Sequence, residues 1–157
     1  MKEGQLSFQE CYSKANSHCF GCGYSNHDGL HIKSYWSDEE RQIAKACFVP
    51  DGKYTGGYPG FVYGGLIAAV LDCHGNGTAY AAGCKFFKVP LQSTDPFRYV
   101  TASLNIDFLR PTPMGCELEL LAEVVEVTSK KVVMNLNVIA NGTETVKCRM
   151  VSVLLRK

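Results

Sequence analysis

The segment that most constrains this chain is residues 64–82, which has the periodicity of a helix but no charged face. Its apolar residues recur at helical spacing: Leu66, Ile67, Val70 and Leu71. The other side carries small residues around one carboxylate, Asp72, and such a helix has to be covered by the rest of the fold. Gly75 and Gly77 would each cost about 1 kcal/mol relative to alanine inside it. We therefore expect close backbone approach at these glycines, or a bend in the helix.

Strand patterns lie on both sides of this segment. The expected strands cover residues 30–36, 41–49, 100–108, 117–127, 131–140 and 143–155. Residues 100–108 alternate between apolar and polar side chains, which is typical of a strand with one buried face. Asn141-Gly142 joins the last two strands and strongly indicates a hairpin. The order predicts two strands, a buried helix and a four-stranded meander.

The remaining segments predict less regular structure. Residues 1–18 are an N-terminal extension with a short amphipathic helix around residues 8–12, residues 50–60 predict a loop, and residues 83–96 predict an irregular lid. An antiparallel sheet with one apolar helix must wrap around that helix, so we expect an α+β fold in a single domain over residues 1–157. A dimer that continues the sheet would cover one of its edges.

Composition excludes several classes of protein. The net charge is +1 and no basic stripe or acidic tail occurs, so we expect neither nucleic acid nor a membrane surface as partner. No apolar run reaches the roughly 18 to 20 residues of a membrane span, and the N-terminus lacks the apolar stretch of a signal peptide. We therefore expect a cytoplasmic protein whose eight cysteines are free thiols.

Two of these cysteines, Cys19 and Cys22, form a C-x-x-C pair. A structural zinc site usually takes four ligands, and although His18 and His27 could complete a set, their spacing is irregular. A redox pair would call for the strand-to-helix context of thioredoxins, which this part of the sequence does not have. The sequence therefore predicts no metal site and no cofactor.

Three motifs carry a resemblance to a known family. Residues 60–72, GFVYGGLIAAVLD, resemble the signature of hot-dog acyl-CoA thioesterases of the PaaI-like (4HBT-type) family. In that family a His-Gly-Gly turn opens the central helix and an acidic residue follows nine positions after the His, as Asp72 follows Tyr63 here. Residues 19–30 are similar to the N-terminal segment of many members, and residues 100–111 resemble the strand after the helix.

The resemblance implies a hot-dog fold, in which an antiparallel sheet wraps one long central helix, and hydrolysis of an acyl-CoA to the free acid and CoA. Coenzyme A enters as part of the substrate, and no metal or redox cofactor is implied. In the family the nucleophile and the oxyanion donor come from different subunits, which implies a homodimer or a dimer of dimers. Two alternatives stay open: a non-catalytic acyl-CoA binding module, and a hot-dog dehydratase, which needs a catalytic His that is missing at Tyr63.

The expected chemistry uses both ends of the 60–72 motif. A helix N-terminus offers unpaired N–H groups and a positive dipole end, and Gly64 and Gly65 let a carbonyl approach closely. The Gly64 N–H is therefore the expected oxyanion donor for a thioester under attack. Asp72 is the expected general base or nucleophile, and both mechanisms stay open. Tyr63 can donate a hydrogen bond that positions the substrate, but it does not replace a histidine base.

Further candidates for substrate binding are polar residues on and beyond the helix. In the family, small hydroxyl or amide residues at the positions of Asn76 and Thr78 can hold the attacking water, and these two are equally consistent with ordinary helix residues near a glycine kink. His74 lies on the apolar stripe, which favours a core histidine over one that orients water or Asp72. The cationic candidates for coenzyme A phosphates, which are otherwise solvated side chains, are Arg110, Lys130 and Lys131.

Overall fold

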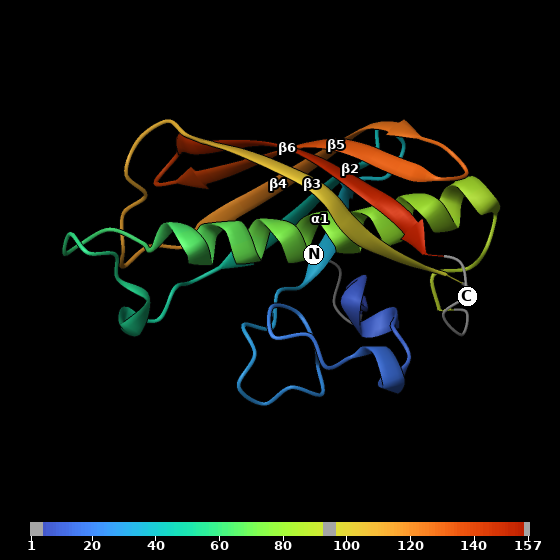
Figure 1. The fold of residues 1–157 in the computed structure, drawn as a ribbon, viewed down its shortest axis with the longest axis horizontal. Helices are drawn as coiled ribbons and strands as arrows, with labels where there is room; N and C mark the ends of the chain where they lie inside the picture. The colour runs from blue at the N-terminus through green and yellow to red at the C-terminus, as the bar shows by residue number, and fades with distance from the viewer. Residues whose placement is uncertain (1–4, 93–96, 156–157) are drawn as a thin grey trace.

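In the computed structural model, which describes residues 5–92 and 97–155, six antiparallel strands curve around one long helix (Figure 1). The helix is α1 (Gly64–Phe87). The strands are β1 (Ser34–Asp38), β2 (Ile43–Phe48), β3 (Arg98–Phe108), β4 (Leu118–Val127), β5 (Lys131–Ala140) and β6 (Thr143–Leu155). Three short 3-10 helices are η1 (Gln9–Cys11), η2 (Lys14–Asn16) and η3 (Gly52–Tyr54). The predicted α+β fold, with its sheet wrapped around one helix, is confirmed.

The sheet order is β1-β2-β4-β5-β6-β3, which makes β1 and β3 the two edge strands. The predicted meander is correct for β4, β5 and β6, but β3 pairs with β6 rather than with β4. Sequence order does not record which edge of a sheet a strand joins, and here the chain loops around the end of the sheet between β3 and β4 (Figure 1). The 11-residue strand β3 therefore has one side that no described strand pairs.

The two glycines in the middle of α1 mark close contacts, as expected. A Cβ on Gly75 would lie 2.1 Å from the sulfur of Met150 on β6. A Cβ on Gly77, on the other side of the helix, would lie 2.3 Å from Nε2 of Gln9. Side chains larger than hydrogen at these positions would push α1 away from the sheet on one side and from the N-terminal segment on the other.

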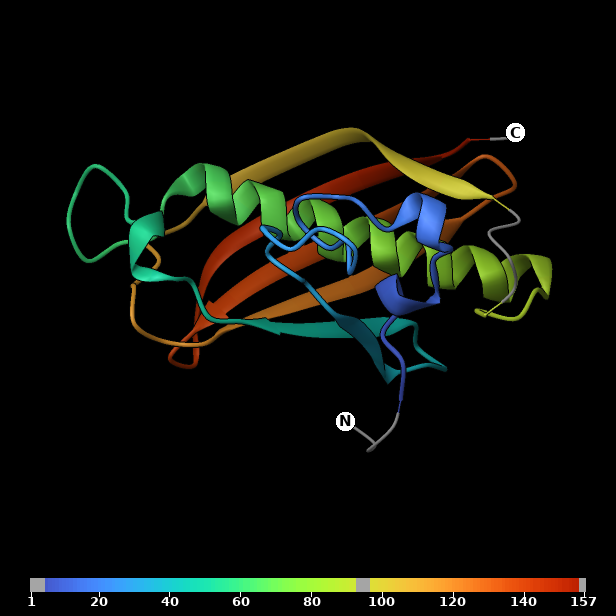
Figure 2. The ribbon, with the colours of Figure 1, turned by 90° about the horizontal axis from the view of Figure 1, so that it is seen from below.

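The N-terminal segment, residues 5–32, lies over the side of α1 that faces away from the sheet (Figures 1 and 2). The short amphipathic helix predicted around residues 8–12 is present only as the 3-10 helix η1 at Gln9–Cys11, and η2 follows it. An amphipathic helix would turn its polar residues outward, whereas the Gln9 side chain points inward and is buried. Its Nε2 donates to the Ser34 hydroxyl at 2.9 Å and its Oε1 accepts from the Ser34 N–H at 2.8 Å.

Helix α1 continues five residues beyond the predicted end, so the expected irregular lid at residues 83–96 begins as helix. Gly83 lies within the helix, where the Tyr99 ring occupies the space that a side chain at this position would need. Lys88 ends the helix in the left-handed conformation, with φ 57° and ψ 40°. Residues 93–96 of the predicted lid lie outside the described part of the chain. Despite its length and its apolar character, α1 falls short of a membrane span, as does every other described helix.

His74 is fully buried where α1 packs against β1, the strand that begins at Ser34. Its Nδ1 lies 2.8 Å from the Ser34 hydroxyl oxygen, which also accepts the hydrogen bond from Gln9. Burial holds the pKa of His74 at about 3, below the ordinary value of 6.5, so the imidazole is neutral in the folded protein at neutral pH. The structure thus places this candidate for substrate binding in the core, on the apolar stripe.

We expect His74 to make folding sensitive to mild acid. An unfolded chain binds a proton at His74 below pH 6.5, whereas the folded chain does so only near pH 3. The stability that the neutral imidazole contributes is therefore complete above pH 6.5 and falls by about 1 kcal/mol for each pH unit below it. Urea unfolding from pH 7.5 to pH 4.5 would measure this slope. A His74→Gln variant should show a shallower slope, and an unchanged slope would contradict the assignment.

Candidate active site

Asp72 projects from α1 toward β3, where its Oδ1 accepts a hydrogen bond from the Thr101 hydroxyl. Asn76, one turn along α1, donates to the same hydroxyl oxygen at 2.7 Å. The side-chain oxygen of Asn76 accepts in turn from the Ser152 hydroxyl of β6 at 3.0 Å. These four side chains form a relay, Ser152–Asn76–Thr101–Asp72, in which every hydrogen bond is donated toward the carboxylate. The relay fixes the orientation of Asp72, since both Thr101 and Asn76 are used as donor and acceptor.

The second oxygen of Asp72 is left for another partner. Oδ2 has no hydrogen-bond donor among the described residues, and Asp72 is half-buried. The residue lines a cavity of about 320 Å³ together with Thr101, Asn76 and Arg98. A carboxylate held by one oxygen and open at the other can take a proton from a water molecule or attack a carbonyl carbon.

A β-bulge in β3 turns Thr101 toward the helix. Ala102 is the extra residue in the pairing of β3 with β6. Before the bulge, Thr101 faces α1 and Val100 is 37% exposed, whereas after it Leu104 faces inward. The sequence predicted one unbroken alternation that put Val100 inside and Thr101 outside. That prediction is wrong for the first half of the strand, because a bulge reverses the two faces.

The other predicted chemical group lies at the N-terminus of α1. The carbonyl of Tyr63 accepts the first hydrogen bonds of the helix, from Leu66 at 3.0 Å and Ile67 at 3.3 Å. The N–H groups of Gly64 and Gly65 precede these bonds and have no acceptor among the described residues. The Tyr63 ring folds back over Gly65, where a Cβ would lie 2.4 Å from its Cζ, and its side chain is exposed. The N-terminus of α1 therefore presents two N–H groups without an acceptor in the described part of the chain, next to the exposed phenol of Tyr63.

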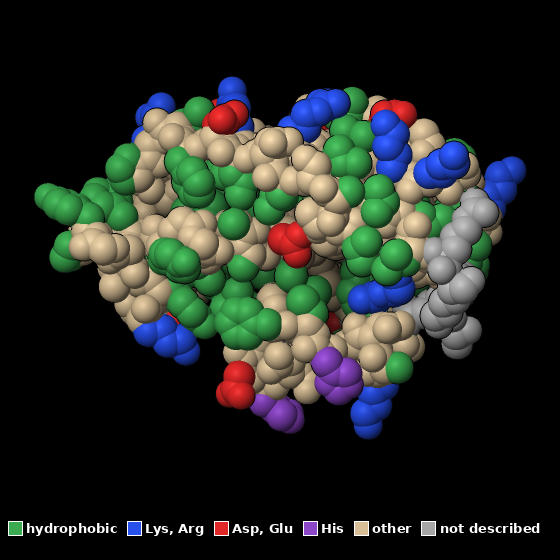
Figure 3. All heavy atoms as spheres, in the orientation of Figure 1, with side chains coloured by type: hydrophobic (Ala, Val, Ile, Leu, Met, Phe, Trp, Pro, Cys, Tyr) green, Lys and Arg blue, Asp and Glu red, His purple; other side chains and the backbone are tan. Residues whose placement is uncertain are grey.

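A mostly apolar groove of about 730 Å³ starts at this helix end. Residues that line it include Gly64, Phe61, Ile67, Phe108, Leu109 and Arg110. Apolar side chains gather over the N-terminal half of α1 and the neighbouring end of β3, on the left of Figure 3. Arg110 adds one cation to a lining that otherwise suits an apolar chain.

Within one chain, Gly64 and Asp72 serve different cavities. Eight residues of helix separate them, which is about 12 Å at roughly 1.5 Å per residue. Gly64 lines the apolar groove and Asp72 lines the smaller cavity at Thr101. The two groups of one chain therefore lie too far apart to act on the same thioester carbon.

The remaining predicted residues are spread over the molecule. Thr78 is fully buried and donates to the carbonyl of His74 at 2.8 Å, inside α1. Lys130 and Lys131 lie at the turn between β4 and β5, and Lys131 pairs with Glu126 at 3.2 Å. In the register of the sheet this turn lies beside the end of β6, far from Arg110 in the same chain. Only Arg110 among the three cations adjoins the groove at Gly64.

The C-x-x-C pair is joined by a third thiol that the sequence analysis did not single out. Cys73 of α1 brings its sulfur to 3.6 Å from that of Cys19, and Cys22 completes the group. Hydrogen bonds to the Cys19 sulfur, from Cys22 and then from Cys73, hold its pKa below the ordinary value. As donors in these bonds, Cys22 and Cys73 have raised pKa values. The three sulfurs therefore form one compact cluster between the loop and the helix.

Sequence reasoning missed Thr101, Ser152 and Cys73. Thr101 and Ser152 were assigned to strands, and only the register of β3 with β6 shows that they lie opposite each other. Cys73 directly follows Asp72, but its pairing with a loop more than 50 residues earlier is a property of the folded chain. The available signal for Thr101 was that it is a polar residue on a predicted strand, and its position at the sheet edge facing Asp72 is set by the fold.

Comparison with known proteins agrees with this architecture. The family model described as the thioesterase superfamily matches residues 59–147, which is more than half of the chain. Acyl-coenzyme A thioesterase THEM5 of Mus musculus is 31% identical over 110 residues, covering 70% of this chain and 39% of that protein. Acyl-coenzyme A thioesterase THEM4 of Xenopus laevis is 29% identical over 105 residues, covering 66% of this chain and 40% of that protein. The chain thus spans about two-fifths of the length of these relatives.

Solved structures share the fold over most of the chain. A thioesterase superfamily protein of Shewanella loihica is 41% identical, with a TM-score of 0.66 and coverage of 90% of this chain and 97% of that one. The PaaI protein of the E. coli phenylacetic acid degradation operon is 19% identical, with a TM-score of 0.63 and coverage of 81% of both chains. The helix wrapped by its sheet is thus the hot-dog fold, and this chain belongs to the thioesterase superfamily.

Proposed function

We propose that this protein hydrolyses acyl-CoA thioesters, with Asp72 as general base or nucleophile. The observation that carries the proposal is the relay, which holds one oxygen of Asp72 and leaves the other open to a cavity. The named activity of THEM4 and THEM5 supports acyl-CoA as the substrate class. A carboxylate that is oriented but open can activate water or add to the thioester carbonyl, and CoA then leaves as a thiol.

The N-terminus of α1 is the proposed oxyanion site. Negative charge develops on the thioester oxygen during attack, and the Gly64 N–H at the positive end of a long helix can stabilise it. Tyr63 and Gly65 would position the thioester beside that N–H. The apolar groove suits an acyl chain or the pantetheine arm, and Arg110 suits a phosphate.

The proposed site is shared between two subunits. Strand β3 is a long edge strand with exposed apolar side chains at Val100 and Phe108. Such an edge is a template for pairing, and two β3 strands joined antiparallel about a two-fold axis would continue the sheet. The same axis would lay two α1 helices side by side in opposite directions. Asp72 of one subunit would then approach Gly64 of the other. Such an approach is needed because the two residues of one chain are separated by about 12 Å of helix, at roughly 1.5 Å per residue.

A hydrolysis assay tests the function directly. Purified protein would be given acyl-CoAs that range from short aliphatic to aromatic acyl groups, and released CoA would be followed with a thiol-reactive dye. Turnover of at least one of them supports the thioesterase. Saturable binding without turnover across the whole panel would instead support the non-catalytic binding module.

Loss of the Thr101 hydroxyl should lower activity without abolishing it. Thr101→Val keeps the shape of the side chain and removes the hydrogen bond that orients Asp72. We expect kcat to fall about tenfold, the equivalent of roughly 1.4 kcal/mol, with little change in KM. Thr101→Ser should keep most of the activity because it keeps the hydroxyl. Thr143→Val, on an exposed position of β6, is the matched control, and full activity in Thr101→Val would remove the relay from the mechanism.

A further inference from the structure

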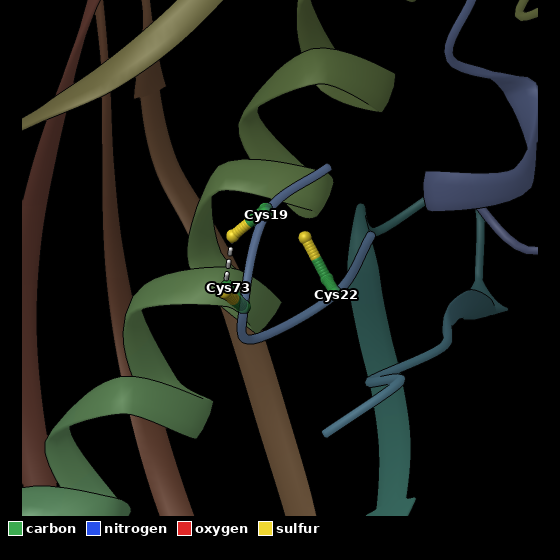
Figure 4. A group of neighbouring side chains, drawn as sticks. All are labelled: Cys19, Cys22 and Cys73. Atoms are coloured by element: carbon green, nitrogen blue, oxygen red, sulfur yellow. Dashed lines mark hydrogen bonds between the residues drawn. The ribbon is translucent and has the colours of Figure 1, made fainter. Parts of the chain in front are cut away.

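Cys19, Cys22 and Cys73 gather three sulfur atoms at the contact between the N-terminal segment and α1 (Figure 4). All three sulfurs lie within 4.8 Å of one another, and those of Cys19 and Cys73 are 3.6 Å apart. Figure 4 shows Cys19 and Cys22 on the loop beside the Cys73 position of α1, with a dashed line from the Cys19 sulfur to Cys73. All three are free thiols, so the group is available for chemistry.

We propose that this thiol triad binds one zinc ion through three thiolates. Zinc–sulfur bonds are about 2.3 Å long, so two sulfurs on a tetrahedral zinc lie about 3.8 Å apart. The 3.6 Å between Cys19 and Cys73 fits this spacing, and Cys22 needs only a small side-chain movement to reach it. A disulfide would bring two sulfurs to about 2 Å and leave the third thiol without a role.

The loop around the C-x-x-C pair is shaped to present sulfur to a cation. The Gly23 N–H donates to the Cys19 carbonyl at 2.8 Å, which closes a tight turn around the two loop cysteines. Gly21 also sits directly on Cys73, where a Cβ would lie 2.2 Å from the sulfur. The tight turn and the missing side chain together bring the loop thiols against the helix thiol.

The surroundings of the triad suit the charge of a zinc complex and leave one coordination position on the metal open. Three thiols lose their protons to solvent as they bind zinc, so the complex with one divalent ion carries one net negative charge. Arg98 lines the same cavity as the three cysteines and brings a positive charge to it. The triad lines the same cavity of about 320 Å³ as Asp72, so water can take the fourth position on the metal. Soft thiolate ligands favour zinc over magnesium or calcium.

Metal binding can be measured on the full chain in its reduced, metal-free form. Equilibrium dialysis against zinc should give one ion per chain, and cobalt should give thiolate-to-metal charge-transfer absorption together with the visible bands of a tetrahedral site. Cys19→Ser should weaken zinc binding at least about a hundredfold, beyond the 10- to 100-fold effect of losing a partner that only supports a ligand. Because Cys19 is exposed, this variant leaves the core intact. Cys22→Ser and Cys73→Ser should behave alike.

Cys116→Ser and Cys148→Ser are the matched controls, since both thiols lie outside the triad. They should bind zinc as the parent does. Zinc binding that survives Cys19→Ser, or a cobalt spectrum without charge-transfer bands in the parent, would overturn the proposal. So would a parent chain that takes up no zinc, whether or not a disulfide forms within the triad. None of these readouts depends on hydrolysis of a thioester, so the proposed function can fail without affecting them.

Discussion

Asp72→Asn should lower kcat for acyl-CoA hydrolysis by at least about a hundredfold, in the range expected for loss of a general base. The amide oxygen can still accept the hydrogen bond from Thr101, so the side chain keeps its place while it loses its charge. An amide neither takes a proton from water nor attacks a thioester effectively. KM should change little, because Asp72 acts on the thioester carbon, whereas the proposed contacts to the acyl chain and the phosphate are made by the groove and Arg110. Steady-state kinetics on the best acyl-CoA of the panel would measure both constants.

Asp28→Asn is the matched control, since Asp28 lies exposed in the N-terminal segment. It should leave kcat and KM as they are in the parent, which would exclude a general effect of removing one negative charge. Circular dichroism and thermal melting would establish that Asp72→Asn is folded. A folded Asp72→Asn protein that hydrolyses acyl-CoA at the parent rate would show that the catalytic carboxylate lies elsewhere.

Activity should return when two inactive variants are paired in one dimer. Gly64→Leu would cover the N–H at the start of α1 and fill the groove, with only slight pressure on Phe108, whose Cζ would lie 3.4 Å from the new Cβ. Consider a heterodimer of one Gly64→Leu subunit and one Asp72→Asn subunit, with sites shared between subunits. One site receives the intact Asp72 of the first and the intact Gly64 of the second, and the other site receives both substitutions. Coexpression with two different affinity tags would isolate that heterodimer. It should show about half of the parent activity, because the two-fold axis gives two sites per dimer.

The opposite arrangement predicts a different result. If Gly64 and Asp72 of the same chain acted together, each subunit of the heterodimer would carry a defect and activity would stay near zero. Gly52→Leu is the control for the bulky side chain, since a Cβ there meets no atom within 4 Å. An inactive but folded heterodimer would therefore disprove the shared site, while the proposed catalytic role of Asp72 would still stand.

Much of the fold could be predicted because its signals are local. Residues 131–140 and 143–155 form strands with the predicted bounds, and Asn141 and Gly142 both take positive φ, at 50° and 73°, as a tight hairpin turn requires. The start of α1 at Gly64 followed from the motif that precedes it. In each case the deciding residues are neighbours in the sequence.

The features that could not be predicted depend on distant contacts. The bulge at Ala102 leaves no composition signal, yet it decides which of Val100 and Thr101 faces the helix. The need for a glycine at position 83 of α1 comes from the Tyr99 ring, which packs against it from β3. The thiol triad appears only when residues 19–22 fold onto Cys73. Pairwise contact across the chain, rather than local pattern, determines all three.

The N-terminal layer over α1, residues 5–32, makes entry to the proposed site depend on a part of the chain that supplies none of its reacting groups. Tyr12 of this layer lines the same cavity as Asp72. The layer is seated against α1 at Gly77, where a Cβ would lie 2.3 Å from Nε2 of Gln9. Substitutions in residues 5–32 are therefore expected to alter which molecules reach the carboxylate while leaving the carboxylate itself in place.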